Sequence, residues 1–231
     1  MWVIADYEPV AVFGLRPSNT TSSGGKSLLI PTPYAIKMAL LDRAIRFDGL
    51  NAGRAYFPAV RDLDVAMRGP DAVAVNRTFQ KVLRPGDKNR VWTETIAQRE
   101  YCVHTGVMSL ALHTVDDTFA AEALPRLLSM VNYFGRRGGF FQCVDLRWSE
   151  TSPDAAYIDL GQPIDLSQLV PGFLQRMDDM RRDADFEEVS TFSKKGTKDD
   201  GGRRSYTVIL PYVVRYHGHN HTVYERTPVL S

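Results

Sequence analysis

The residues best suited to contact a nucleic acid are two arginines in the glycine-rich run FGRRGGFF, at positions 134–141. Glycines let a backbone approach a phosphate chain, arginines pair with phosphates through two hydrogen bonds, and exposed rings stack on unpaired bases. Arg136, Arg137 and Gly138 are therefore candidate RNA-binding residues. The alternative is a helix end and turn, with the arginines in solvent and the phenylalanines in the core.

A second candidate is a pair of strands rich in basic residues. The runs DAVAVNRTFQKVLR (71–84) and RVWTETIAQREYCV (90–103) are typical of strands, and the turn formers PGDKN (85–89) lie between them. From Arg77 to Arg99 there are six basic and two acidic residues, a local excess of +4, with Phe79 and Trp92 among them. A projecting hairpin of this kind suits an RNA backbone, and its candidate contacts are Arg77, Lys81, Arg84, Lys88 and Arg90. A solvated hairpin whose charges discourage aggregation is the alternative.

The polar loop TTSSGGKS (20–27) has some features of a phosphate-binding loop. The pattern G-x-x-x-x-G-K-[ST] requires a glycine where Thr20 stands, and Pro31 and Pro33 prevent a helix from starting at Lys26. Hydrolysis of ATP or GTP is therefore disfavoured. Two hypotheses remain: a flexible polar loop, or a loop whose amides and Lys26 contact a nucleic-acid phosphate.

Three of the five histidines, His217, His219 and His221, occur in the run HGHNH. On a straight strand they would share one face and could bind zinc or another transition metal. Gly218 and Asn220 favour a turn instead, and no cysteine or carboxylate cluster completes a site, so we predict no metal and no other cofactor. The histidines could otherwise touch RNA phosphates, supply a general base, or simply be exposed.

These candidates need a framework, and the periodicity of the chain predicts one. We expect a strand in 2–14, a helix over 34–47 that stops at Gly49, a strand over 107–115, a helix over 116–134 and a strand over 139–148. Pro125 either kinks the second helix or starts its second half, and Gly135 ends it. A short helix over 171–182 and two strands, 205–216 and 222–229, complete the chain.

This order predicts an α+β fold with a ferredoxin-like (RRM-like) β-α-β-β-α-β core whose central hairpin is enlarged. We expect one elaborated domain. Residues 1–148 form the core, including a hairpin at about 71–103, and residues 149–231 form a β-rich C-terminal extension packed on it.

The overall charge limits how such a protein could bind RNA. The 231 residues include 28 Lys and Arg against 27 Asp and Glu, a net charge of +1, so we expect binding along one side only. No apolar run is long enough for a transmembrane helix, and the first residues lack a secretory pattern. Two cysteines, Cys102 and Cys143, fit a reducing cytoplasm.

Taken in chain order, three segments resemble the Cas-five family, the RAMP-type subunits of CRISPR Cascade complexes. They are LLIPTPYAIKMALLDRAI (28–45), TIAQREYCVHTGVMSLAL (95–112) and YFGRRGGFFQ (133–142), and the resemblance covers about residues 2–148. It implies a thumb hairpin on a ferredoxin-like core that grips the 5′ handle of a CRISPR RNA. The implied protein partners are the backbone and large subunits, with target DNA contacted indirectly.

The resemblance also bears on catalysis. Most members of the family are not catalytic, so we assign no catalytic residue. Some relatives cut precursor RNA without metal, using Tyr, Lys and His side chains. A metal-independent endoribonuclease is therefore the alternative function.

Overall fold

The structure is a computed structural model that describes residues 1–20, 25–85, 92–164, 171–190 and 201–228. Its centre is a five-stranded sheet of β1 (Trp2–Pro9), β2 (Asp64–Arg68), β5 (Met108–His113), β6 (Phe141–Ser149) and β7 (Ile158–Asp159). The strand order is β6-β1-β5-β2-β7, and every neighbouring pair is antiparallel. Alternate residues of β1 point to opposite faces, as a strand requires. Val3, Ala5 and Tyr7 enter the main core, whereas Ile4 packs in a smaller cluster on the other face.

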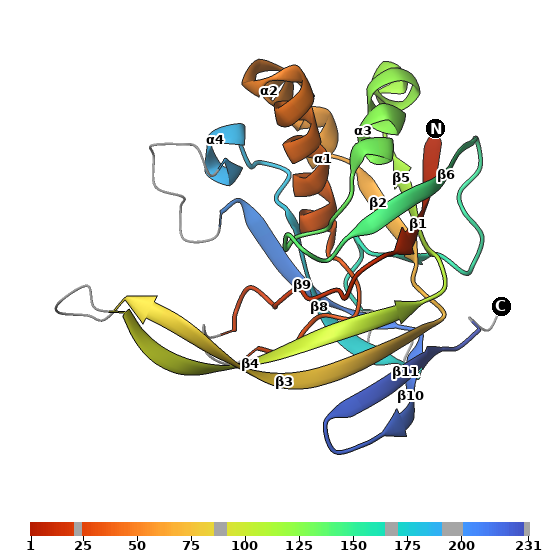
Figure 1. The fold of residues 1–231 in the computed structure, drawn as a ribbon. Helices are drawn as coiled ribbons and strands as arrows, with labels where there is room; N and C mark the ends of the chain where they lie inside the picture. The colour runs from red at the N-terminus through yellow and green to blue at the C-terminus, as the bar shows by residue number, and fades with distance from the viewer. Residues whose placement is uncertain (21–24, 86–91, 165–170, 191–200, 229–231) are drawn as a thin grey trace.

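Helices cover one face of this sheet (Figure 1). They are α1 (Pro33–Asp48), α2 (Leu50–Arg61), the π-helical turn η1 (Phe119–Ala123) and α3 (Leu124–Met130). The Thr32 side chain accepts a hydrogen bond from the Ala35 N–H and begins α1, and Gly49 ends it with a φ of 89°. The predicted helix over 34–47 and its stop at Gly49 are therefore confirmed. The Tyr7 hydroxyl donates to the Leu128 carbonyl over 2.8 Å and ties the sheet to α3.

The predicted helix over 116–134 is only partly present. Pro125 lies in the first turn of α3, so it starts the second half of this helical region and does not kink it. The helix ends at Met130 because Val131 is already extended, and the prediction that Gly135 ends it is wrong. None of the helices in the described segments is long and apolar enough to span a membrane.

The predicted helix over 171–182 is wrong, because these residues form β8 (Phe173–Met180). This strand pairs with β9 (Arg203–Leu210), and α4 (Phe186–Val189) follows it. Its inward side chains include Gln175, which accepts from the Leu29 N–H over 2.7 Å and donates to the Ile30 carbonyl over 3.1 Å. A buried polar residue that is hydrogen-bonded to a distant segment interrupts the alternation of polar and apolar residues that marks a strand. A hydrophobicity pattern therefore does not reveal the strand here.

The hairpin predicted over 71–84 and 90–103 is confirmed as β3 (Ala72–Pro85) and β4 (Trp92–Thr105). It projects from the body of the molecule (Figure 1) and belongs to a second sheet with the order β10-β11-β3-β4. The other two strands are β10 (Tyr212–His217) and β11 (His221–Arg226), and β11 corresponds to the predicted strand over 222–229. The prediction of a single strand over 205–216 is wrong, because the chain breaks at Pro211 and divides these residues between β9 and β10, which belong to different sheets. The register pairs Arg77 with Glu100, so these two side chains share one face of the hairpin.

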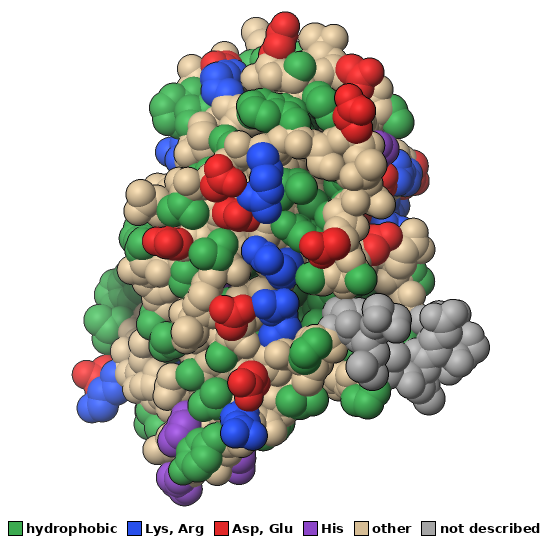
Figure 2. Space-filling view, turned by 90° about the vertical axis from the view of Figure 1, so that its right-hand side faces the viewer, with side chains coloured by type: hydrophobic (Ala, Val, Ile, Leu, Met, Phe, Trp, Pro, Cys, Tyr) green, Lys and Arg blue, Asp and Glu red, His purple; other side chains and the backbone are tan. Residues whose placement is uncertain are grey.

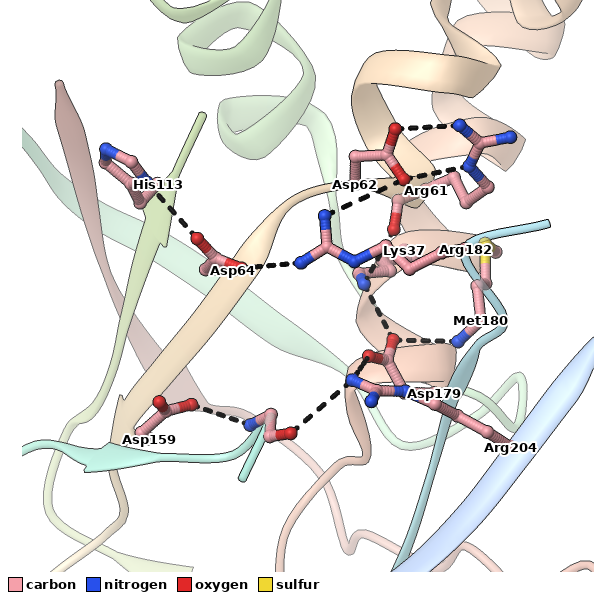
Figure 3. Close-up of polar contacts among 11 residues, drawn as sticks. Lys37, Arg61, Asp62, Asp64, His113, Asp159, Asp179, Met180, Arg182 and Arg204 are labelled. Atoms are coloured by element: carbon pink, nitrogen blue, oxygen red, sulfur yellow. Dashed lines mark hydrogen bonds and ion pairs between the residues drawn. The ribbon is translucent and has the colours of Figure 1, made fainter. Parts of the chain in front are cut away.

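A buried polar network holds the β8–β9 hairpin against the helical layer (Figure 3). Lys37 of α1 is 2% exposed, and its Nζ donates to Asp179 Oδ1 over 2.7 Å and to the Arg61 carbonyl over 2.9 Å. Arg204 Nη2 donates to the other carboxylate oxygen of Asp179 over 2.9 Å. Burial lowers the pKa of the Lys37 ammonium group, and the neighbouring Asp179 opposes that shift only in part. These contacts join residues 173–210 to the first helix.

Candidate nucleic-acid interface

A cleft of about 440 Å³ lies at the base of the hairpin, where segments far apart in the sequence meet. The polar loop contributes Lys26, the hairpin contributes Arg77 and Glu100, and the HGHNH run lines a third side. Strand β11 pairs with β3 so that His221 lies opposite Asn76, and this pairing places the histidines at the base of the hairpin. Three of the four candidate segments predicted from the sequence therefore border one cavity.

Glu100 fixes the position of the polar loop against the hairpin. One carboxylate oxygen accepts from the Ser27 N–H over 2.9 Å, and the other lies 3.4 Å from Arg77 Nη2. The Glu100 side chain is only 10% exposed, whereas that of Arg77 is 54% exposed. Lys26, the neighbour of Ser27, is thus held beside Arg77 at the mouth of the cleft.

The histidine run forms the turn between β10 and β11, as predicted. The Gly218 N–H donates to the His221 carbonyl over 2.8 Å, and the His221 ring stacks on Tyr216 at 5.2 Å. His217 Nδ1 is hydrogen-bonded to the Thr222 hydroxyl over 2.8 Å. The rings of His217 and His221 therefore contact different neighbours. The described residues contain no group of three or more His, Cys, Asp or Glu placed to hold a metal ion.

Figure 2 shows histidines gathered at one end of the molecule, among hydrophobic and charged side chains. On this face basic and acidic side chains alternate over the surface, in keeping with the net charge of +1. A second hollow of about 390 Å³ shares Lys26, Arg77 and Glu100 with the cleft and continues past Gln98 and Arg99 of β4. The two hollows are therefore neighbours at the base of the hairpin.

The glycine–arginine segment approaches the hairpin from another direction. The Arg136 guanidinium lies over the Tyr101 ring, 5.8 Å from its centroid, and the Tyr101 hydroxyl accepts from Gln80 Nε2 over 3.0 Å. Gly135 and Gly138 have φ values of 77° and 104°, a conformation that favours glycine. A fourth segment is thus joined to the hairpin base.

The burial of side chains in the FGRRGGFF run is compatible with both of its interpretations. Phe134 and Phe141 are buried in the core, as the structural alternative expects, while Phe140 is 44% exposed. Arg136, Arg137 and Gly138 are exposed, as contact with a ligand would require.

The remaining hairpin candidates extend toward its tip. Lys81 is 80% exposed, and its Nζ lies 3.7 Å from Glu94 Oε2. For Arg84 the structure gives the backbone pairing with Thr93, and Lys88 and Arg90 lie outside the described residues. The sequence motifs did not identify Glu100 or Tyr101, because only the strand register reveals that they face Arg77 and Asn76.

One face of the hairpin is apolar and exposed. Four large apolar side chains are each 60–67% exposed there, and they lie on the same face as Arg77 and Glu100: Phe79, Leu83, Trp92 and Ile96. Exposed apolar groups gathered in one patch are typical of an interaction surface.

His104 lies deep beneath the groove, near the base of β4. Its Nε2 donates to the Leu29 carbonyl over 2.8 Å, its ring packs beside Phe13 and Phe141, and Nδ1 has no hydrogen-bond partner among the described residues. Burial lowers the pKa of His104 to about 4. The ring is therefore neutral in the folded chain at neutral pH.

We expect His104 to make the fold sensitive to acid. The unfolded chain binds a proton at this residue near pH 6.5 and the folded chain only near pH 4, so stability falls as pH decreases through this interval, by roughly 3 kcal/mol in total. Urea unfolding of the wild type and of His104→Phe at several pH values measures this. The free energy of unfolding of the wild type, relative to that of His104→Phe, should fall toward acid pH. A relative value that stays constant with pH would show that His104 does not titrate in this way.

The comparisons with known proteins agree with the sequence motifs. No protein-family model matches the chain. A CRISPR-associated protein Cas5 from Archaeoglobus fulgidus is 25% identical over 217 residues, which are 90% of this chain and 92% of that protein. This chain is similar to a Cas5 protein over nearly the whole length of both. The resemblance to the Cas-five family predicted from three short segments is thus confirmed and extends into the C-terminal third.

Two solved structures are also similar to the chain. A crystal structure of a CRISPR protein from Archaeoglobus fulgidus has a TM-score of 0.48 and 12% identity, covering 98% of this chain and 92% of that one. A chain in the cryo-EM structure of the Type III-B Cmr-beta bound to cognate target RNA and AMPPnP has a TM-score of 0.43 and 10% identity. It matches 97% of this chain over 86% of its own length.

Proposed function

We propose that this chain is a Cas5-type subunit that binds the 5′ handle of a CRISPR RNA in a Cascade-like complex and does not cut it. The observation that carries the proposal is that Lys26 and Arg77, from two separate segments, line one cleft at the base of the hairpin, while Arg136 lies against Tyr101 on the other face of the same hairpin. Cations grouped along a groove beside aromatic rings suit a single RNA strand. The Cas5 relative supports the assignment to a CRISPR system.

The strand order supports a ferredoxin-like (RRM-like) core. When only β1, β2, β5 and β6 are counted, the order across the sheet is β6-β1-β5-β2, which is fourth, first, third and second in chain order. Helices follow β1 and β5, the first and third of these strands. The β3–β4 hairpin is inserted between the second and third of these strands, where a thumb belongs. We therefore divide the chain into a core, residues 1–148, and an extension, residues 149–231, that packs on it.

The proposal assigns different contacts to the two basic segments. Arg77 and Lys81, with Arg84, Lys88 and Arg90, hold the RNA backbone, while Arg136, Arg137 and Gly138 hold the handle and Lys26 adds a further phosphate contact. The Lys81–Glu94 pair does not oppose this, because an exposed ion pair contributes at most about 1 kcal/mol and a phosphate can replace the carboxylate. The Arg77 side chain is 54% exposed beside the largely buried carboxylate of Glu100, so it is also accessible to a phosphate.

The partners follow from the same assignment. Backbone and large subunits of the complex are the protein partners, in the cytoplasm. The exposed apolar side chains of the hairpin share a face with Arg77 and Lys81, so a protein partner would cover them beside the RNA. Target DNA is reached indirectly, through the RNA.

The experiment is purification of the tagged chain from its own host under native conditions, followed by sequencing of bound RNA and mass spectrometry of bound proteins. We expect stoichiometric RNA with a constant repeat-derived 5′ end, together with other CRISPR subunits. A preparation free of RNA and of such subunits would refute the proposal.

A second candidate function is a metal-independent endoribonuclease that processes precursor RNA. The observation in its favour is that His217 and His219 line the same cleft as Lys26 and Arg77, so a base and phosphate-binding cations are near one another. Labelled precursor RNA incubated with purified protein and a chelator decides between the two functions. Specific cleavage that is lost in a triple variant of the turn histidines would establish the nuclease.

A further inference from the structure

The cleft at the hairpin base has two chemically different walls. Lys26, Arg77, the turn histidines and the carboxylate of Glu100 supply the charged and hydrogen-bonding part of its lining. Phe173, Val214 and Tyr224 supply the apolar and aromatic part. A ligand that fills it must carry an anionic group at one end and a flat apolar group at the other.

The apolar wall is preformed. The Phe173 and Tyr224 rings meet edge to face, with centroids 5.1 Å apart and planes at 70°. They come from β8 and β11, so the C-terminal extension supplies this wall and the core supplies the cations. Rings fixed in this way provide a surface for an unstacked base without further ordering.

The carboxylate of Glu100 makes the cleft selective for ligands that donate hydrogen bonds. Its carboxylate is largely buried and is held by the Ser27 N–H and by Arg77. A fixed carboxylate accepts hydrogen bonds and donates none, so it favours a ligand with an amino or hydroxyl group at that place, such as an exocyclic amine or a ribose hydroxyl.

The volume limits the ligand to one unit. The cleft volume of about 440 Å³ lies within the range of small-molecule binding sites. A double-stranded nucleic acid is too large to enter it. Resting on the proposed function, we infer that this cleft binds one unstacked nucleotide of the RNA. Its phosphate contacts Lys26, Arg77 and the histidine turn, and its base lies against Phe173 and Tyr224.

Histidine NMR signals test this inference directly. The five imidazole C–H signals are assigned by single His→Gln substitutions, and the protein is titrated with AMP, CMP, GMP and UMP, and separately with inorganic phosphate. We expect at least one nucleotide to shift the signals of His217, His219 and His221, with those of His104 and His113 unchanged. Equal shifts with phosphate alone, or no shifts with any nucleotide, would overturn the inference.

Two matched valine substitutions supply the second measurement. Val214 lines the cleft and is 57% exposed, and Val115 is 93% exposed after the end of β5, outside the cleft. A glutamate at position 214 places a charged carboxylate in the apolar part of the lining, where the base is expected to lie, without disturbing the core. Val214→Glu should weaken binding of single-stranded RNA and of the nucleotide about tenfold, and Val115→Glu should leave both unchanged.

The outcomes separate this inference from the proposed function. If RNA binds Val214→Glu as tightly as it binds the wild type, the nucleotide site is refuted and RNA binding stands. If nucleotides shift the histidine signals but no single-stranded RNA binds, the nucleotide site is supported and the proposed function fails.

Discussion

Lys37→Met is expected to lower the free energy of unfolding by about 3–5 kcal/mol, the typical effect of breaking a buried ion pair. Lys37 and Asp179 are 2% and 4% exposed, and their 2.7 Å contact joins α1 to β8. Without the ammonium group, Asp179 keeps Arg204 on one oxygen, but the other oxygen loses its charged partner although the side chain stays buried. Urea denaturation followed by circular dichroism measures the change.

Lys81→Met is the matched control, since it removes the same atoms from an exposed pair. Lys81 is 80% exposed beside Glu94, so its loss should change stability by less than about 1 kcal/mol. Equal effects of the two substitutions would show that the buried network does not hold the C-terminal extension in place.

Replacing Arg136 and Arg137 together by alanine is expected to weaken RNA binding roughly 100-fold or more, since hydrogen bonds to charged groups contribute about 1.5–3 kcal/mol each. Each lost phosphate contact also flattens the dependence of log affinity on log salt by about 0.7 for a single strand, so the double variant should lose about 1.4. Fluorescence anisotropy with labelled guide RNA over a range of salt concentrations measures both quantities.

The control removes two arginines from the helical layer, away from the hairpin. Arg46 pairs with Asp42 within α1, and Arg126 of α3 pairs with Asp48. Arg46→Ala with Arg126→Ala should leave both the affinity and the salt slope as in the wild type. An unchanged slope in the Arg136 and Arg137 variant would mean that the glycine–arginine segment is a structural turn only.

Local signals predicted the elements that depend on local chemistry. Helix α1 follows two prolines and stops at a positive-φ glycine, and both strands of the hairpin have a β-rich composition. Helix α2 was not predicted because Gly53 and Pro58 lie inside it; it buries Phe57 and Val60 and packs against α1. In such places tertiary packing outweighs intrinsic propensity.

The site was predictable in its parts and not in its arrangement. Arg77, Arg136 and the histidine turn are visible as motifs, but the β11–β3 pairing that unites the turn with Arg77 is a long-range contact. The PGDKN run lies between β3 and β4 in the sequence, and the turn itself lies outside the described residues. A register shift of one residue, however, moves every side chain to the other face, so the partners Glu100 and Tyr101 could not be identified from sequence.

The most direct test of RNA-handle recognition is the affinity of the purified chain for two single strands of equal length at the same physiological salt concentration. One is the repeat-derived 5′ handle, and the other has the same base composition in scrambled order. We predict at least tenfold tighter binding of the handle, since contacts to base edges contribute about 1–3 kcal/mol each and phosphate contacts do not discriminate. Equal affinity for the two strands, or no binding of either, would contradict the account.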